Sequence, residues 1–154
     1  MILEQWFAVP IWYDSFKGIR DQEYIDAINF CNSLSLNSDG RRVSNIGGWQ
    51  SNDLFYRDII DTPLQVFFEQ IEFSIKDVQL DLGIQRRLFI DNMWININNL
   101  NNSNSPHIHP ACSISGVFYL TNNNSNIVFT RSTDINKHHL DWIGSNKNTP
   151  LSIT

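Results

Sequence analysis

The chain has 154 residues, of which 42% are hydrophobic and 12% aromatic, which is enough for one domain (1–154) with its own core. Its 16 acidic and 11 basic side chains give a formal net charge of −5. Lys and Arg form no run, which argues weakly against a nucleic-acid or anionic-membrane partner, because phosphate neutralisation needs clustered cations; we expect no nucleic-acid partner. The basic pairs 41–42 and 86–87 are expected on a solvated surface.

The two cysteines, Cys31 and Cys112, lie far apart and lack metal-type spacing, so a reduced, cytoplasmic protein is expected. Residues 1–10 contain no basic start and no small-residue cleavage site, and therefore do not resemble a signal peptide. No apolar run is long enough to cross a bilayer. We expect no membrane partner.

The first half of the chain predicts an edge strand and a helix. Gln5–Tyr13 is rich in aromatic and β-branched residues, with Pro10 in its middle, which is typical of an edge strand. Asp21 is a candidate cap for a helix whose apolar residues have helical spacing; they are Ile25, Ile28, Cys31 and Leu34. The polar run 35–42 ends this helix. The pair Gly47–Gly48 predicts a turn, or backbone that something approaches closely.

A longer amphipathic helix is predicted from Thr62 to Leu82. Thr62 can cap it, Pro63 fits its first position and Gly83 fits the position after its end. Its apolar residues repeat at intervals of three and four; they are Leu64, Phe67, Phe68, Ile71, Ile75, Val78 and Leu82. Such a stripe needs a flat apolar partner, and the face of a β-sheet supplies one.

Strand patterns follow this helix. In Leu88–Asn98 the residues Met93, Ile95 and Ile97 alternate with Asn and Trp, so one face is aliphatic and the other polar. Gly116–Leu120 and Ile127–Phe129 are predicted to form a hairpin, and 151–154 resembles the start of a strand. The order of elements predicts an all-β core with packed helices, in the α+β class.

His107 and His109 are the strongest candidates for chemistry. Residues two apart in an extended segment point to the same face, so both imidazoles can meet at one point. Neutral imidazole binds iron, zinc, copper and nickel, so the pair alone does not specify the ion. Surface loop histidines are the alternative.

Three segments together resemble a known family. They are Trp94–Asn98, Ser105–Pro110 with its His-x-His-Pro motif, and Ser113–Leu120 with Ser-Gly-Val-Phe-Tyr-Leu. They are similar to the core of the 2-oxoglutarate and iron(II) dependent oxygenases carried by phage and marine bacteria. Ser44–Leu54 is similar to that family's Gly-Gly-Trp block, and the likeness extends loosely over residues 7–129.

The resemblance implies a double-stranded β-helix, or jelly roll, with helices packed on one sheet. Its metal would be iron(II), with 2-oxoglutarate and O₂ as co-substrates, and it would hydroxylate a substrate that the sequence does not identify. Asn96, Ser115 and Tyr119 are expected to hold 2-oxoglutarate if their faces line the interior. For Tyr119 a packing role is an equal alternative. Trp49 and Trp94 are interpreted as packing residues.

Two departures from the family pattern stand out. His109 occupies the place where most such oxygenases have a carboxylate, which would leave the metal one charge unit more positive. The third ligand and the basic residue that pairs with 2-oxoglutarate normally come from late strands. His138, His139 and Arg131 are the downstream candidates. Our preferred interpretation is that the jelly roll is incomplete at its C-terminus, and that the third ligand and the basic residue belong to strands after residue 154.

Two other functions remain open. The cupins, another jelly-roll class, use His-x-His with a following Glu, and no acidic residue lies between His109 and Asp134. A cupin-like metal or small-ligand binder is therefore one alternative. An inactive, phage-encoded structural or interaction protein is the other, and nothing in the sequence excludes a homo-oligomer.

Overall fold

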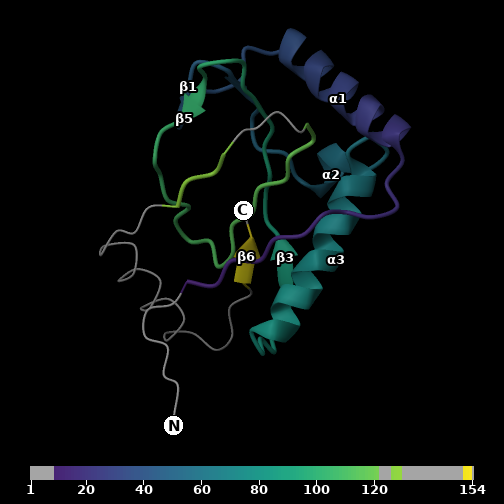
Figure 1. The fold of residues 1–154 in the computed structure, drawn as a ribbon, viewed down its shortest axis with the longest axis vertical. Helices are drawn as coiled ribbons and strands as arrows, with labels where there is room; N and C mark the ends of the chain where they lie inside the picture. The colour runs from purple at the N-terminus through teal and green to yellow at the C-terminus, as the bar shows by residue number, and fades with distance from the viewer. Residues whose placement is uncertain (1–8, 122–125, 130–150, 154) are drawn as a thin grey trace.

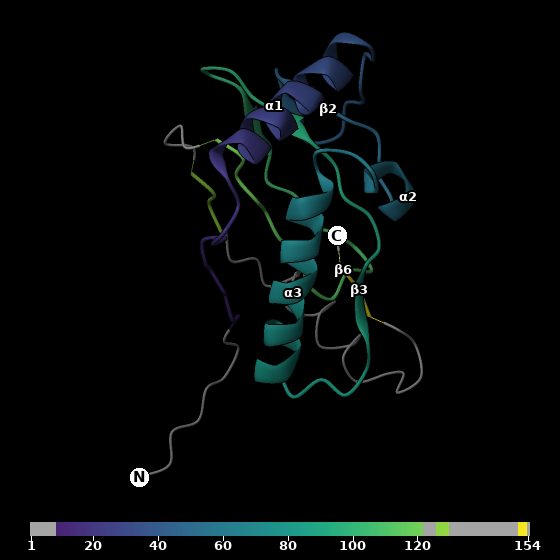
Figure 2. The same ribbon diagram turned by 90° about the vertical axis from the view of Figure 1, so that its right-hand side faces the viewer.

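The computed structural model describes residues 9–121, 126–129 and 151–153. Three helices lie on one side of the extended segments (Figures 1 and 2). They are α1 (Asp21–Leu36), α2 (Tyr56–Ile59) and α3 (Gln65–Asp81). Within the described residues no helix is long and apolar enough to span a membrane.

The strands are short and pair two by two. β1 (Asn45–Ile46) is antiparallel to β5 (Ser103–Asn104), and β2 (Trp49–Gln50) is antiparallel to β4 (Asn96–Ile97). β3 (Leu88–Ile90) runs parallel to β6 (Leu151–Ile153), which confirms the strand predicted at the end of the chain. The strands in the described part of the chain do not close into a barrel, so the jelly roll stays a proposal.

The first two pairs belong to one long antiparallel ribbon, formed by residues 44–54 and 93–105. Its register runs from Asn45 opposite Asn104, through Trp49 opposite Ile97, to a bridge between Leu54 and Met93. Ladder hydrogen bonds continue between the strands, such as Leu54 N to Met93 O at 2.7 Å. The ribbon joins the two blocks that carry the family resemblance.

The glycine pair lies where the ribbon changes register. Gly48 has a φ of 63°, and a Cβ added to it would lie 2.9 Å from the backbone oxygen of Ile97 and would also meet the Asn98 amide. Both features exclude a larger residue, because L side chains avoid positive φ and no Cβ fits at that distance. The predicted unusual backbone and close approach are confirmed.

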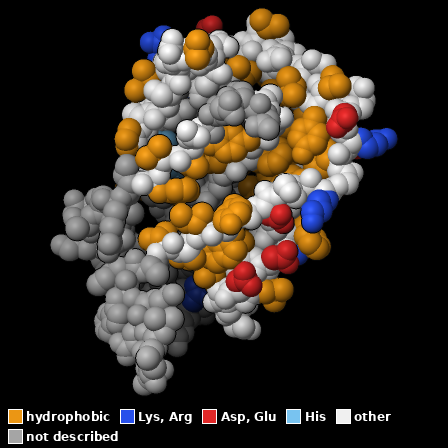
Figure 3. Space-filling model, viewed as in Figure 1, with side chains coloured by type: hydrophobic (Ala, Val, Ile, Leu, Met, Phe, Trp, Pro, Cys, Tyr) orange, Lys and Arg blue, Asp and Glu red, His pale blue; other side chains and the backbone are white. Residues whose placement is uncertain are grey.

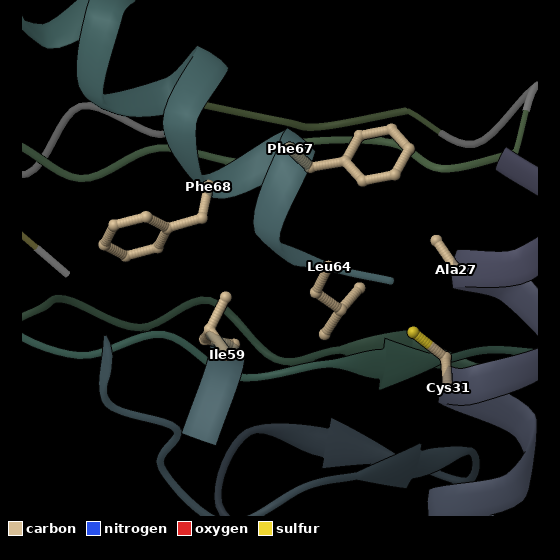
Figure 4. Packing of buried hydrophobic residues seen from close by; sticks show 6 residues of the cluster. All are labelled: Ala27, Cys31, Ile59, Leu64, Phe67 and Phe68. Atoms are coloured by element: carbon tan, nitrogen blue, oxygen red, sulfur yellow. The ribbon is translucent and has the colours of Figure 1, made fainter. Parts of the chain in front are cut away.

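The core lies between the helices and the ribbon. Figure 4 shows six buried residues of the core, contributed by α1, by α2 and by the start of α3; they are Ala27, Cys31, Ile59, Leu64, Phe67 and Phe68. Met93, Ile95 and Ile97 pack against them from the ribbon. The aliphatic face predicted from alternation is therefore the flat partner that the long helix needs. Figure 3 shows charged side chains mainly along the helical side of the molecule.

The two predicted helices form, with different starts. The structure makes Arg20 the N-cap of α1, since the Glu23 carboxylate accepts a hydrogen bond from its backbone N at 2.7 Å; the prediction of Asp21 was wrong by one residue. α3 begins at Gln65, after a turn in which the Thr62 hydroxyl accepts from Leu64 N at 3.2 Å. Gly83 follows its C-cap with a φ of 62°, as predicted.

Three strand predictions have a different outcome. Residues 116–120 and 127–129 are not strands in the structure. In the first of these segments the Phe118 ring stacks on Phe16, with ring centroids 4.7 Å apart. Of Gln5–Tyr13, residues 5–8 lie outside the described residues and 9–13 form no strand. There the Trp12 indole donates to the Asp81 carboxylate at 3.0 Å.

Replacing Gly48 with Ala should destabilise the fold more than replacing Gly83 with Ala. Both glycines have positive φ, which costs an L residue about 1–2 kcal/mol. A Cβ at Gly83 meets nothing within 4 Å, whereas one at Gly48 meets backbone. Denaturant titration should give an unfolding free energy lowered by about 1 kcal/mol for Gly83→Ala and by clearly more for Gly48→Ala. Equal losses would contradict the close approach in the ribbon.

The Cys31 thiol should resist modification. It is buried in the core cluster, and burial raises its pKa from 9.0 to about 11, so little reactive thiolate forms near pH 8. Cys112 is half-buried and should react with a thiol reagent first. Because the pKa of Cys31 is higher in the folded than in the unfolded protein, the neutral thiol's contribution to the unfolding free energy is complete below pH 9. This contribution is lost as the pH rises towards 11. Equal labelling rates for the two cysteines in the folded protein would contradict this packing.

Candidate metal centre

The histidine segment begins where the ribbon ends. Ser105 follows β5, and both its backbone N and its hydroxyl donate to the Ser44 carbonyl, at 2.8 and 3.2 Å. The Asn104 amide donates to the hydroxyl of Ser44, which is buried, at 3.0 Å. The chain immediately before His107 is therefore held by a polar network on the neighbouring strand.

The structure brings the two imidazoles together. The Nε2 atoms of His107 and His109 lie 3.0 Å apart. Their ring centres are 5.0 Å apart and their planes differ by 28°. The rings therefore face one common point, as their spacing of two residues in extended chain predicts.

The Nδ1 atoms of both histidines also lie within hydrogen-bond distance of an oxygen. His107 Nδ1 lies 2.8 Å from the backbone oxygen of Ser105, and a carbonyl only accepts, so this nitrogen carries the hydrogen. His109 Nδ1 lies 2.6 Å from the Ser115 hydroxyl, which can donate or accept. Each ring is thus oriented through the nitrogen that faces away from its partner.

This arrangement fits a bound transition-metal ion. Imidazole nitrogens in adjacent coordination positions, each about 2.1 Å from an ion, lie about 3 Å from one another, which agrees with the 3.0 Å between the Nε2 atoms. Ligating histidines normally donate their other ring N–H to an oxygen, and both rings have one within reach. The pair therefore supplies two nitrogen donors at the spacing of adjacent octahedral positions, and the described residues bring no third His, Cys, Asp or Glu side chain to it.

Arg41, which the sequence analysis places on the surface, lies over the tryptophan that contacts His109. The Trp94 ring contacts His109 edge-on at 5.2 Å, and the Arg41 guanidinium lies over the Trp94 ring at 5.7 Å. Arg41 pairs with Asp53, its side chain is only 28% exposed, and its Nε is buried with no hydrogen-bond partner. The surface prediction was therefore wrong for Arg41. No sequence pattern marked it, because its partners come from other segments.

The other predicted site residues are distributed differently. Ser115 contacts the pair through His109. Asn96 is exposed on β4 opposite Gln50, which is buried at 2% exposure and has an unpartnered side-chain oxygen. Tyr119 is 46% exposed. Of the three residues expected to hold 2-oxoglutarate, Ser115 alone has a described hydrogen bond with a histidine of the pair.

The remaining predicted ligands cannot be placed. His138, His139 and Arg131 lie outside the described residues. Among residues 9–121, 126–129 and 151–153, no group of three or more His, Cys, Asp or Glu side chains is arranged to hold a metal ion. The centre described by the structure therefore consists of two imidazoles and the groups that orient them.

The chain was compared with protein-family models, curated proteins and solved structures. None of the three comparisons finds a match.

Proposed function

We propose that this chain is an iron(II) and 2-oxoglutarate dependent oxygenase that hydroxylates an unidentified substrate. The observation that carries the proposal is the 3.0 Å approach of the His107 and His109 Nε2 atoms. Neutral imidazole nitrogens suit iron(II), as they also suit zinc, copper and nickel. The His-x-His-Pro and Gly-Gly-Trp segments resemble those of the oxygenase family. This resemblance, and not the geometry, is the reason for proposing iron and 2-oxoglutarate.

The proposed reaction has a simple balance. Iron(II) lets 2-oxoglutarate and O₂ react so that one oxygen atom enters a substrate C–H bond and the other enters succinate, with release of CO₂. In this chain His107 and His109 would hold the ion, and Trp94 would limit the rotation of the His109 ring. Two protein nitrogens leave most of an octahedral ion's positions for a further side chain, the co-substrate and O₂.

Charge supports an anionic co-substrate. An imidazole at position 109, instead of a carboxylate, leaves the metal one unit more positive. Arg41 is paired with Asp53 through one end of its guanidinium, but its Nε–H has no partner, and its planar fork suits a carboxylate. We assign to Arg41 the pairing with 2-oxoglutarate that the resemblance expects from a late strand.

The fold and compartment belong to the same proposal. The ribbon and the helices packed on its aliphatic face would form one layer of a jelly roll within a single domain. Both cysteines are free, which suits a reducing cytoplasm. A cupin-like binder remains the alternative function, because it would use the same histidine pair without oxidising a substrate.

Anaerobic iron(II) together with 2-oxoglutarate should raise the melting temperature of the protein. A ligand at about 100 times its Kd adds about 2.7 kcal/mol to the native state, or roughly 5–10 °C for a domain of this size. His107→Ala should abolish the increase, measured by differential scanning fluorimetry. An increase of the same size in the variant would exclude His107 as a ligand. A metal-dependent increase without succinate release on adding O₂ would favour the cupin-like binder.

Arg41→Ala should weaken 2-oxoglutarate binding about tenfold or more while leaving iron binding unchanged, because a charge-assisted hydrogen-bond pair is lost. Anaerobic isothermal titration of the metal-free protein with iron(II), and of the iron-loaded protein with 2-oxoglutarate, measures the two affinities. Arg42→Ala is the matched control, because Arg42 is the exposed neighbour. Since the first variant leaves Asp53 unpaired, the double variant Arg41→Gln with Asp53→Asn should show the same loss. Unchanged 2-oxoglutarate affinity in both Arg41 variants would refute this role.

A further inference from the structure

We propose that the Ser115 hydroxyl reverses its hydrogen bond with His109 when a metal binds, and so serves as the positioning residue that lets His109 change tautomer. The inference rests on the proposed metal binding by the histidine pair. It follows from three contacts: Ser105 O to His107 Nδ1 at 2.8 Å, Nε2 to Nε2 at 3.0 Å, and Ser115 Oγ to His109 Nδ1 at 2.6 Å.

The first contact fixes His107. A backbone carbonyl has no hydrogen to donate, so His107 Nδ1 must carry one. In a neutral imidazole the other nitrogen is then an acceptor. His107 Nε2 therefore presents a lone pair towards His109, whether or not a metal is bound.

The second contact fixes His109 in the metal-free, neutral pair. Two lone pairs facing each other at 3.0 Å would repel, so His109 Nε2 must donate to His107 Nε2. His109 Nδ1 is then the acceptor, and the Ser115 hydroxyl must donate to it. The hydrogen bonds run in one direction, from Ser115 through His109 and His107 to Ser105.

Metal binding requires the opposite arrangement at His109. Both Nε2 atoms must then offer lone pairs to the ion, so the hydrogen of His109 moves to Nδ1. The Ser115 hydroxyl now accepts from that N–H. The pair keeps the same number of protons, because the hydrogen lost from Nε2 is the one regained at Nδ1 through solvent exchange.

A hydroxyl suits this position because it can donate in one state and accept in the other. A carboxylate could serve only the loaded state, since it only accepts. The bond should be stronger in the loaded state, because the ion polarises the ring and makes its N–H a better donor. Removing the hydroxyl therefore weakens metal binding, but only by the difference between the two bonds, which corresponds to about fivefold in affinity.

The tautomers can be read directly by NMR. We would record long-range ¹H–¹⁵N spectra of the full chain with and without Zn²⁺, about 1.5 pH units above the ordinary imidazole pKa of about 6.5. His107 should carry its hydrogen on Nδ1 in both states, whereas that of His109 should move from Nε2 to Nδ1 on adding Zn²⁺. The same His109 tautomer in both states would overturn the proposal.

Zn²⁺ affinities test the role of the hydroxyl. Ser115→Ala should bind Zn²⁺ about fivefold more weakly than the original chain. Ser115→Thr keeps a hydroxyl and should bind like the original chain. Ser115→Asp should bind Zn²⁺ more tightly, because its carboxylate favours the metal-bound tautomer of His109. Ser113→Ala is the matched control, since the Ser113 hydroxyl has no hydrogen-bond partner. Absence of Zn²⁺ binding that depends on His107 would overturn the metal proposal itself. Binding that is equal in Ser115→Ala and Ser113→Ala would overturn only the role of Ser115.

Discussion

The antiparallel pairing of residues 44–54 with residues 93–105 is the contact on which the other features depend. It joins segments that are far apart in the chain through backbone hydrogen bonds and a defined register. Because side chains alternate across a strand, the same pairing turns Met93, Ile95 and Ile97 towards the helices. The ribbon thus provides the core with a flat surface and ends at the histidine pair.

The position of that pair follows from where the pairing stops. The last ladder contacts use Ser44, Asn104 and Ser105, so the chain leaves the ribbon in a fixed direction just before His107. The two imidazoles are then oriented by oxygens of Ser105 and Ser115 rather than by burial in the core. The pair is therefore exposed at the end of the ribbon, while its backbone is held by the fold.

The two histidines are oriented by hydrogen-bonding groups of different kinds. The Ser105 carbonyl can only accept and therefore locks His107, whereas the Ser115 hydroxyl allows either tautomer of His109. Arg41 and Trp94 contribute charge and shape from the neighbouring strands. Polar side-chain atoms of Gln50, on the ribbon, and of Arg41, just before it, are buried without partners, and such atoms are costly to bury alone.

The sequence by itself determined the features that depend on local rules. The spacing of apolar residues defined both helices, Gly83 marked the end of α3, alternation identified the aliphatic face of residues 93–97, and the spacing of His107 and His109 placed their rings together. Only the tertiary structure decided which residues cap α1, that residues 116–120 pack through Phe118 instead of pairing as a strand, that Arg41 is half-buried beside Trp94, and that Ser115 bonds to His109. Periodicity reports which face of an element is apolar, but it contains no information on which distant segment will meet that face. Contacts between polar side chains from different segments depend on that meeting and have no periodic pattern of their own.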